Sequence, residues 1–258
     1  FDLIVTASDG VNSTDQAVTV SVTDVNEAPV FTSGSTASVA ENQTAAYTAA
    51  ASDPDLTSPT YSISGGADAA LFNIDATTGV GTFKTAPDFE NPADAGGDNV
   101  YDIIVRASDG TNNVDQAVAI SVTDVNDNSP VFTSGTTASV VEGTLIAYDA
   151  DATDADVSDT IAYSLSGIDA ALFNIDSSTG VVTFKVAPDF ELPTDTGGDN
   201  VYDFTVTASD GTHSTDRTVA VTVTNGNENA PVFTSPTTAS VAENGTAAYT
   251  ADATDIAP

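Results

Sequence analysis

The chain has 258 residues and a formal net charge of −34, from 38 acidic and only four basic side chains. Such a charge repels nucleic acids and anionic membrane surfaces, so no nucleic-acid partner is expected. The absence of cysteine excludes disulfides and thiolate metal sites. No apolar run approaches the roughly 18–20 residues of a membrane span, so no direct membrane insertion is expected in this segment.

Alternating apolar and polar residues predict β-strands along most of the chain. Residues 68–72 and their copy from residue 169 are the only segments expected to hold a helical turn. Strands are predicted at 101–106, where Tyr101, Ile103 and Val105 share one face, and at 117–122, with a turn at 108–113 between them. Residues 172–176 and 181–184 predict a second hairpin, in which Gly180 takes a positive φ.

The sequence repeats itself with a period of 101 residues. Phe31, Phe132 and Phe233 each begin the same F-T-S motif at that spacing. We therefore predict two whole domains, at 30–130 and 131–231, preceded by a C-terminal fragment of a repeat at 1–29 and followed by an N-terminal fragment at 232–258. About seven short strands per repeat predict an all-β fold of antiparallel β-sandwiches in tandem.

Acidic residues keep the same spacing, although a hydrophobic core tolerates looser repetition. Oxygen ligands for a hard cation would explain fixed carboxylates, and residues 124–130 (DVNDNSP) are dense in such oxygens. If the loops at facing ends of the sandwiches meet there, seven carboxylates crowd together: Glu41, Asp88, Glu90, Asp127, Asp154, Asp156 and Asp210. Taken alone, the Asp-Gly pairs at 109 and 210 are ordinary turn residues, and the D-x-D motif at 154–156 is equally weak evidence for a cation site.

Taken together, these motifs resemble tandem cadherin repeats of the bacterial kind. In the family's order they are VVE at 140–142, ATDAD at 152–156, FNIDSSTGV at 173–181, DFE at 189–191 and ASDG at 208–211. Residues 124–130 match the family's D-x-N-D-N-x-P linker. The resemblance covers essentially the whole chain. It implies seven-stranded, Greek-key, immunoglobulin-like sandwiches of the cadherin type, with about three Ca²⁺ ions at each complete joint between repeats.

The resemblance also implies a set of ligands for the second joint. The two ions nearer the upstream domain would be held by Glu41, Asp88, Glu90 and Asp127 and by the carbonyl of Val125, and Asp156 would reach one of them. The third ion would be held by Asn126, Asp154, Asp156, Asp210 and the carbonyl of Asn128. Asp124, which opens the linker, would be a supporting residue.

The other two joints depart from the family pattern. At the first joint, Glu replaces the bridging Asp, and the corresponding residues are Asp24, Asn26, Glu27, Asp53, Asp55 and Asp109. At the third joint, the downstream D-x-D motif is incomplete, and the corresponding residues are Glu142, Asp189, Glu191, Asn227, Glu228 and Asp255. We therefore expect the second joint to bind calcium most tightly.

No catalytic constellation is visible in the sequence. His213 is the single histidine, and there is neither a G-x-S-x-G elbow nor a phosphate-binding loop. No enzymatic activity, catalytic residue or organic cofactor is expected. The predicted function is a calcium-rigidified extension or adhesion module of a large bacterial cell-surface or secreted protein, with an extracellular location. Its partners would be other copies of the repeat, another surface protein or a glycan.

Two alternatives stay open. A carbohydrate-binding module of a polysaccharide-degrading system is one, although the chain has no tryptophan to form a sugar platform. A self-assembling extracellular fibre is the other, in which residues 1–29 and 232–258 complete sandwiches between copies by strand addition. A cut array of repeats explains the same fragments more simply.

Overall fold

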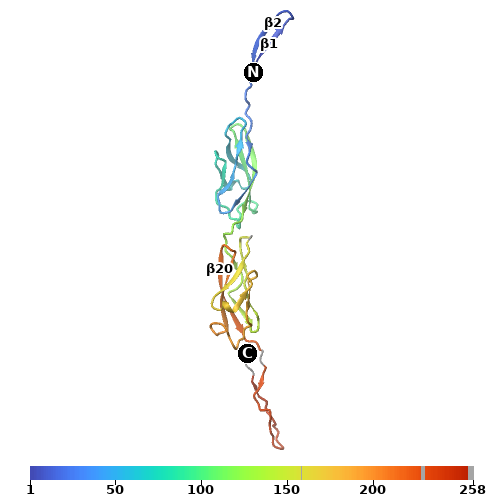
Figure 1. Cartoon of the computed structure of the whole chain (residues 1–258), viewed down its shortest axis with the longest axis vertical. Coiled ribbons are helices and arrows are strands. Elements are labelled where there is room, and N and C mark those ends of the chain that lie inside the picture. Colours follow the sequence, from blue (N-terminus) through green and yellow to red (C-terminus); the bar gives the residue numbers. More distant parts are fainter. Residues whose placement is uncertain (158, 228–229, 255–258) are drawn as a thin grey trace. The chain divides into compact units, whose positions relative to one another are not determined.

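The computed structural model describes residues 1–157, 159–227 and 230–254 (Figure 1). Strands make up nearly all of its regular structure. The chain divides into two compact units, Phe1–Val125 and Asn126–Pro258, so the division falls inside the predicted second linker. The finer domain boundaries at residues 29, 130 and 231 stay predictions. Among the described residues, no helix is long and apolar enough to cross a membrane.

The first unit begins with a hairpin of β1 (Asp2–Ser8) and β2 (Ser13–Thr19). Its larger sheet has the order β4 (Thr36–Ala40), β11 (Asn113–Thr123), β10 (Val100–Ser108) and β7 (Thr60–Gly65). Its smaller sheet has the order β5 (Ala45–Thr48), β9 (Val80–Phe83) and β8 (Phe72–Ile74). Two short strands, β3 (Val30–Phe31) and β6 (Ala51–Ser52), pair separately, and the predicted helical turn is the 3₁₀ helix η1 (Ala69–Leu71).

The second unit repeats this arrangement. Its larger sheet has the order β13 (Thr137–Val141), β20 (Ser214–Thr224), β19 (Val201–Ser209) and β16 (Ala162–Ser166). Its smaller sheet has the order β14 (Ile146–Asp149), β18 (Val181–Phe184) and β17 (Phe173–Ile175). The short pair is β12 (Val131–Phe132) with β15 (Ala152–Thr153), η2 spans Ala170–Leu172, and β21 (Val232–Phe233) pairs with β22 (Ala253–Thr254).

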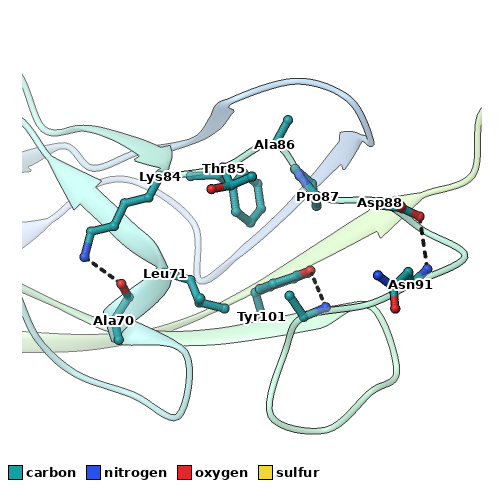
Figure 2. A pocket seen from close by; sticks show the side chains of 11 residues that line it. Ala70, Leu71, Lys84, Thr85, Ala86, Pro87, Asp88, Asn91 and Tyr101 are labelled. Carbon is teal, nitrogen blue, oxygen red and sulfur yellow. Dashed lines mark hydrogen bonds between the residues drawn. The ribbon is translucent and has the colours of Figure 1, made fainter.

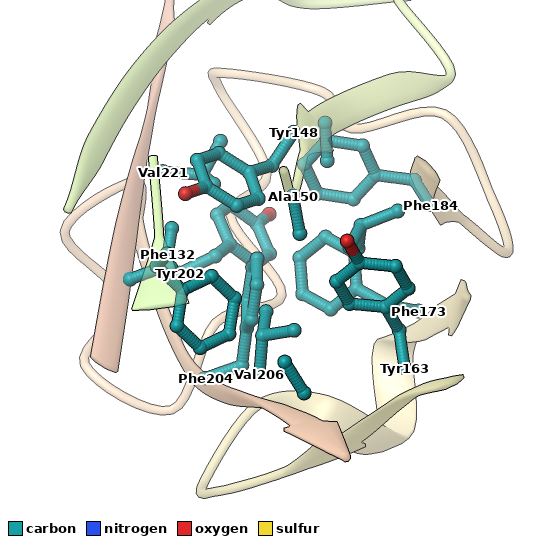
Figure 3. Close-up of a cluster of buried hydrophobic side chains, with 14 of the residues drawn as sticks. Phe132, Tyr148, Ala150, Tyr163, Phe173, Phe184, Tyr202, Phe204, Val206 and Val221 are labelled. Carbon is teal, nitrogen blue, oxygen red and sulfur yellow. The ribbon is translucent and has the colours of Figure 1, made fainter. Parts of the chain in front are cut away.

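The core of each unit lies between its two sheets, as the alternating pattern predicts. In the first unit, Tyr101, Ile103 and Val105 of β10 are all at most 2% exposed. In the second unit, aromatic rings from both sheets meet, and the centroids of Phe173 in β17 and Phe204 in β19 are 4.8 Å apart (Figure 3). The predicted hairpin at β17 and β18 is confirmed, and Gly180 has a φ of +77°.

Two features of the sandwich differ from the prediction. β4 runs parallel to β11, and β13 runs parallel to β20, so the larger sheets are not purely antiparallel. The opening segment of each repeat is split, because β3 pairs with β6 and the chain then continues beside β11 in the larger sheet. A second interruption separates β5 from β6, so the region from Val30 to Thr123 has nine strand segments where about seven strands were predicted.

Some repeated carboxylates connect loops inside each unit. Asp169 is 3% exposed, and its side chain accepts hydrogen bonds from the Thr196 N–H and hydroxyl and from the Asp203 N–H, at 2.6–2.9 Å. Asp68 accepts the Ala95 and Asp102 N–H groups in the same way. Burial alone would raise the pKa of Asp169, but these hydrogen bonds outweigh it and lower the pKa.

This depressed pKa predicts a pH dependence that Asp169→Asn should reduce. A carboxyl with a lowered pKa contributes stability above its ordinary value of 3.8, and that contribution is lost as the pH falls through the folded-state value. Denaturant unfolding at neutral pH and at about pH 3 should therefore show a larger acid-induced loss for the parent than for the variant. The exposed Asp151→Asn serves as the charge-matched control. Equal losses in the parent and in Asp169→Asn would contradict this role.

Candidate cation-binding clusters

A glutamate directly after β4, and its copy after β13, connects two segments at one end of each unit. Glu41 is 2% exposed, and its carboxylate accepts the N–H of Phe89 at 2.7 Å and the N–H of Val125 at 2.9 Å. Glu142 accepts the N–H groups of Phe190 and Gly226 at 2.8 and 2.6 Å. Each glutamate therefore holds the D-x-E loop (residues 88–90 or 189–191) against the residues that follow β11 or β20.

The same end of each unit gathers three carboxylates. Oxygens of Glu41, Asp88 and Glu90 lie within 4.8 Å of one another, and so do oxygens of Glu142, Asp189 and Glu191. Two unit charges about 4 Å apart repel by roughly 1 kcal/mol in water and by about 4 kcal/mol near a protein surface. A set of oxygen donors with no nitrogen or sulfur suits a hard divalent cation. Three of the predicted upstream ligands are thus brought together in each unit, whereas Asp127 belongs to the second unit.

The D-x-D motifs leave one oxygen of each first aspartate available. In the second unit, Asp154 Oδ1 accepts the N–H of Asp156 at 3.3 Å, and in the first unit Asp53 Oδ1 accepts the N–H of Asp55 at 2.9 Å. Within the described residues, Asp154 Oδ2 and Asp53 Oδ2 are buried without a hydrogen-bond partner. Because buried polar atoms normally have partners, these two oxygens fit a cation as their missing partner.

The linker residues of the second unit are folded onto Asp156, which is 1% exposed. The N–H and the side-chain amide of Asn128 donate to the two Asp156 oxygens, each at 2.9 Å. The same amide donates to Asp127 Oδ1 at 2.9 Å. Asn126 Oδ1 lies 2.9 Å from His213 Nδ1. The structure therefore gathers Asn126, Asp127 and Asn128 at one end of the unit with Asp154 and Asp156.

The first joint has equivalent contacts despite its shorter linker. Oxygens of Asp24, Glu27 and Asp55 lie within 4.8 Å of one another, and the N–H of Glu27 donates to Asp55 at 2.7 Å. The pKa of Glu27 is raised because it shares a hydrogen bond with Asp55 and lies beside the negative charges of Asp55 and Asp24. Asn26 donates to Asp109 Oδ2 at 2.8 Å. Crowded carboxylates are thus present where Glu27 replaces the family's aspartate.

The A-x-D aspartates have a turn role that the sequence alone also allowed. Asp109 Oδ1 accepts the N–H groups of Thr111 and Asn112, and these two bonds lower its pKa. Asp210 Oδ1 accepts the N–H groups of the next turn, including that of His213. The Nδ1 atom of His213 lies 3.7 Å from Asp210 Oδ2. Sequence reasoning missed both contacts of His213, with Asn126 and with Asp210, because it considered this histidine only as a possible catalytic residue.

The third joint is the least complete. Its opening residue, Asn225, takes the place of Asp124 in the second joint, and its side-chain amide donates to Glu191 Oε1 at 2.8 Å. An amide donor therefore occupies an oxygen that a cation could otherwise use. Asn227 is exposed. Glu228 and Asp255 lie outside the described residues.

A cavity of about 520 Å³ lies beside Asp88 in the first unit (Figure 2). Several of its polar groups are engaged within the protein: Lys84 donates to the Ala70 carbonyl at 2.6 Å, and Asp88 accepts the N–H of Asn91 at 3.0 Å. The Tyr101 hydroxyl accepts the N–H of Ala93 at 3.3 Å. The acidic cluster, rather than this cavity, therefore carries the assignment of the site.

No family model matches this chain. Curated relatives include human Protocadherin-23, with 32% identity over 67% of the chain, and human Cadherin EGF LAG seven-pass G-type receptor 2, with 34% identity over 92% of it. These matches cover only 5% and 9% of the two relatives, so the chain spans a small part of their length.

Solved structures that resemble this chain are also repeats of cadherins and protocadherins. Mouse Cadherin-23 EC22-24 superposes with a TM-score of 0.62 at 26% identity, over 88% of this chain and 77% of that one. Human Protocadherin-24 EC1-2 superposes with a TM-score of 0.63 at 21% identity, over 78% of this chain and all of that one, and supports the fold.

Crowding of carboxylates predicts that Asp189→Asn stabilises the chain when divalent cations are removed. The variant relieves repulsion within the Glu142 cluster, which should contribute about 0.5 kcal/mol for an exposed group. Thermal unfolding in excess chelator measures the change, and the exposed Asp151→Asn controls for total charge. A decrease in melting temperature specific to Asp189→Asn would show that the cluster is not under repulsion.

Proposed function

Because the repeats of this chain belong to the cadherin family, we propose that they form a calcium-binding extension of a larger extracellular protein. One observation carries the proposal: three carboxylates gather at equivalent places in both units, and the first aspartate of each D-x-D motif, Asp53 or Asp154, buries one oxygen without a hydrogen-bond partner. The donor atoms are all oxygens, which is the ligand chemistry of calcium. About three ions per complete joint is part of the proposal.

The side chains at one end of the first unit would form the upstream part of the second joint. Glu41 connects the D-x-E loop to Val125, which positions Asp88 and Glu90 and presents the Val125 carbonyl. Asp124 would support this group. A bound calcium ion supplies two positive charges and accepts roughly six to eight oxygens. The side chains thereby exchange mutual repulsion for attraction to a common centre.

The second unit would supply the downstream part of the same joint. Asn128 holds Asp156 and Asp127 in place, and Asp154 keeps one oxygen available. His213 lies next to both Asn126 and Asp210, so these two side chains are near each other. The Asn128 carbonyl completes the proposed set of ligands. Shared ligands restrain the short linker, because bending it would separate oxygens from their ion.

Mass action sets the size of the effect. A ligand that binds only the ordered joint stabilises it by about 2.7 kcal/mol at a hundredfold excess over its dissociation constant. The joint would therefore be ordered where calcium is abundant, as outside cells. We propose that the ordered array holds an adhesive domain away from a cell surface, and that no catalytic step takes place in this segment.

The wider setting is also a proposal. Other copies of the repeat, or another surface protein, are the proposed partners. The relatives named above are human and mouse proteins, so the bacterial source predicted from the resemblance stays a prediction. The carbohydrate-binding and fibre-forming functions stay alternatives without an observation that favours them.

Differences between the joints predict a hierarchy of calcium affinity. The second joint has Asp124, whereas Asn225 at the third joint donates its amide to Glu191. Asn225→Asp should therefore add a tighter class of sites in isothermal titration, because it replaces a competing donor with a carboxylate. The double variant Asp127→Ala, Asp156→Ala should remove the tightest class of the parent.

Magnesium provides the control for this experiment, because it requires a tight octahedron and releases water reluctantly. It should bind weakly to parent and variants alike. If Asp127→Ala, Asp156→Ala binds as many calcium ions as the parent with the same affinity, the ligand assignment is wrong. If calcium and magnesium protect the chain equally, screening of the net charge explains the stabilisation instead.

A further inference from the structure

Six large aliphatic side chains are exposed in the second unit at positions where the first unit has small or polar residues, and five of them, all except Ile168, lie near the turn before β14 and the segment after β18. The exposed fractions of these five run from 52% to 80%, and they form what we call the aliphatic patch: Val141, Leu145, Ile146, Val186 and Leu192. The residues 101 positions earlier are Ala40, Thr44, Ala45, Thr85 and Asn91. Both units have the same sheet order, so the fold does not require aliphatic residues there.

The central residues of the patch come from two segments joined by hydrogen bonds. The N–H of Phe184 donates to the Leu145 carbonyl at 2.8 Å, and the N–H of Gly143 donates to the Pro188 carbonyl at 2.9 Å. Val186 therefore lies between two contacts with the segment that carries Leu145. Ile146 follows at the start of β14, which forms an edge of the smaller sheet.

The two outer residues extend the patch on either side. Val141 ends β13, and its carbonyl accepts the N–H of Thr144, next to Leu145. In the first unit, the counterparts of Val186 and Leu192 line one cavity, so these positions are neighbours in the fold. Scattered exposed aliphatic residues are ordinary, whereas a group of them in one place indicates a contact surface.

Opposite charges lie on the two sides of Ile146. In the pairing of β14 with β18, Ile146 is in register with Thr183, and Asp149 is in register with Val181. Along the chain, Val181 comes two residues before Thr183, and Lys185 comes two residues after it. Both Lys185 and Asp149 are exposed. A two-fold axis near Ile146 would therefore place Lys185 of one copy on the side where the other copy has Asp149.

We propose that the aliphatic patch binds a second copy of this chain about a two-fold axis near Ile146. Such a contact is self-complementary, because Ile146 meets its own copy while Lys185 of each chain meets Asp149 of the other. The first unit has Thr48 in place of Asp149, so it lacks this charge pattern as well as the aliphatic residues. The inference rests on the proposed association with other copies of the repeat and names the surface that would carry it, and none of its residues is a proposed calcium ligand.

The first unit supplies the variant that tests the patch. Leu145→Thr, Ile146→Ala and Val186→Thr together place the first unit's residues on the same backbone and leave Glu142 and Glu191 unchanged. Sedimentation velocity over a concentration series in calcium buffer should show reversible dimers of the parent. The triple variant should weaken dimerisation by about tenfold or more, because it removes buried aliphatic area. Its calcium titration should match that of the parent.

Charge exchange tests the two-fold arrangement separately. Lys185→Asp and Asp149→Lys should each weaken dimerisation, and the two changes together should restore it, because the exchanged charges again face each other. Lys84→Asp is the matched control, since Lys84 and Lys185 donate to equivalent carbonyls in the two units. It should leave dimerisation unchanged.

Three results would overturn the proposal. They are a parent that stays monomeric to submillimolar concentration, a triple variant that dimerises like the parent, and a charge-exchanged double variant that stays as weak as its single variants. Failure of the calcium function would appear instead in the titrations, with dimerisation intact in chelator. The two proposals can therefore fail independently.

Discussion

Crowding of carboxylates at the ends of the units is the constraint on which the rest of the structure depends. Glu41 and Glu142 accept two backbone N–H groups each, so their loops bring further acids close rather than holding them apart. With a net charge of −34 and four basic residues, the chain has few internal cations to balance these groups. A cation from solution is the remaining source of neutralisation, and this requirement links the fold to the proposed function.

The cores and hairpins were predictable because they depend on local patterns. Alternation along residues 101–106 identified the face of Tyr101, Ile103 and Val105, which is buried. The direction of β4 beside β11 was not predictable in this way. That pairing joins segments far apart in sequence, and it follows from the passage of the opening segment from β6 to β11. The residues of β4 do not themselves indicate which strand they pair with or in which direction.

The acids show a second limit of sequence reasoning. Asp68 and Asp169 repeat at the same spacing as the proposed ligands, yet their carboxylates accept backbone N–H groups inside the units. Spacing and residue type do not separate these two roles. Only the structure separates them, because it shows which oxygens already have donors and that Asp53 and Asp154 each keep one buried oxygen without a hydrogen-bond partner. The ordered family motifs were therefore more informative than the period itself.

Small-angle scattering of the full chain during a calcium titration tests the central claim most directly. If shared oxygens restrain the second linker, added calcium should lengthen the maximum dimension and narrow the distribution of conformations. The β-rich circular dichroism should stay constant, since the cores are apolar and separate from the acidic clusters. A scattering profile that does not change while calorimetry shows calcium binding would contradict the account.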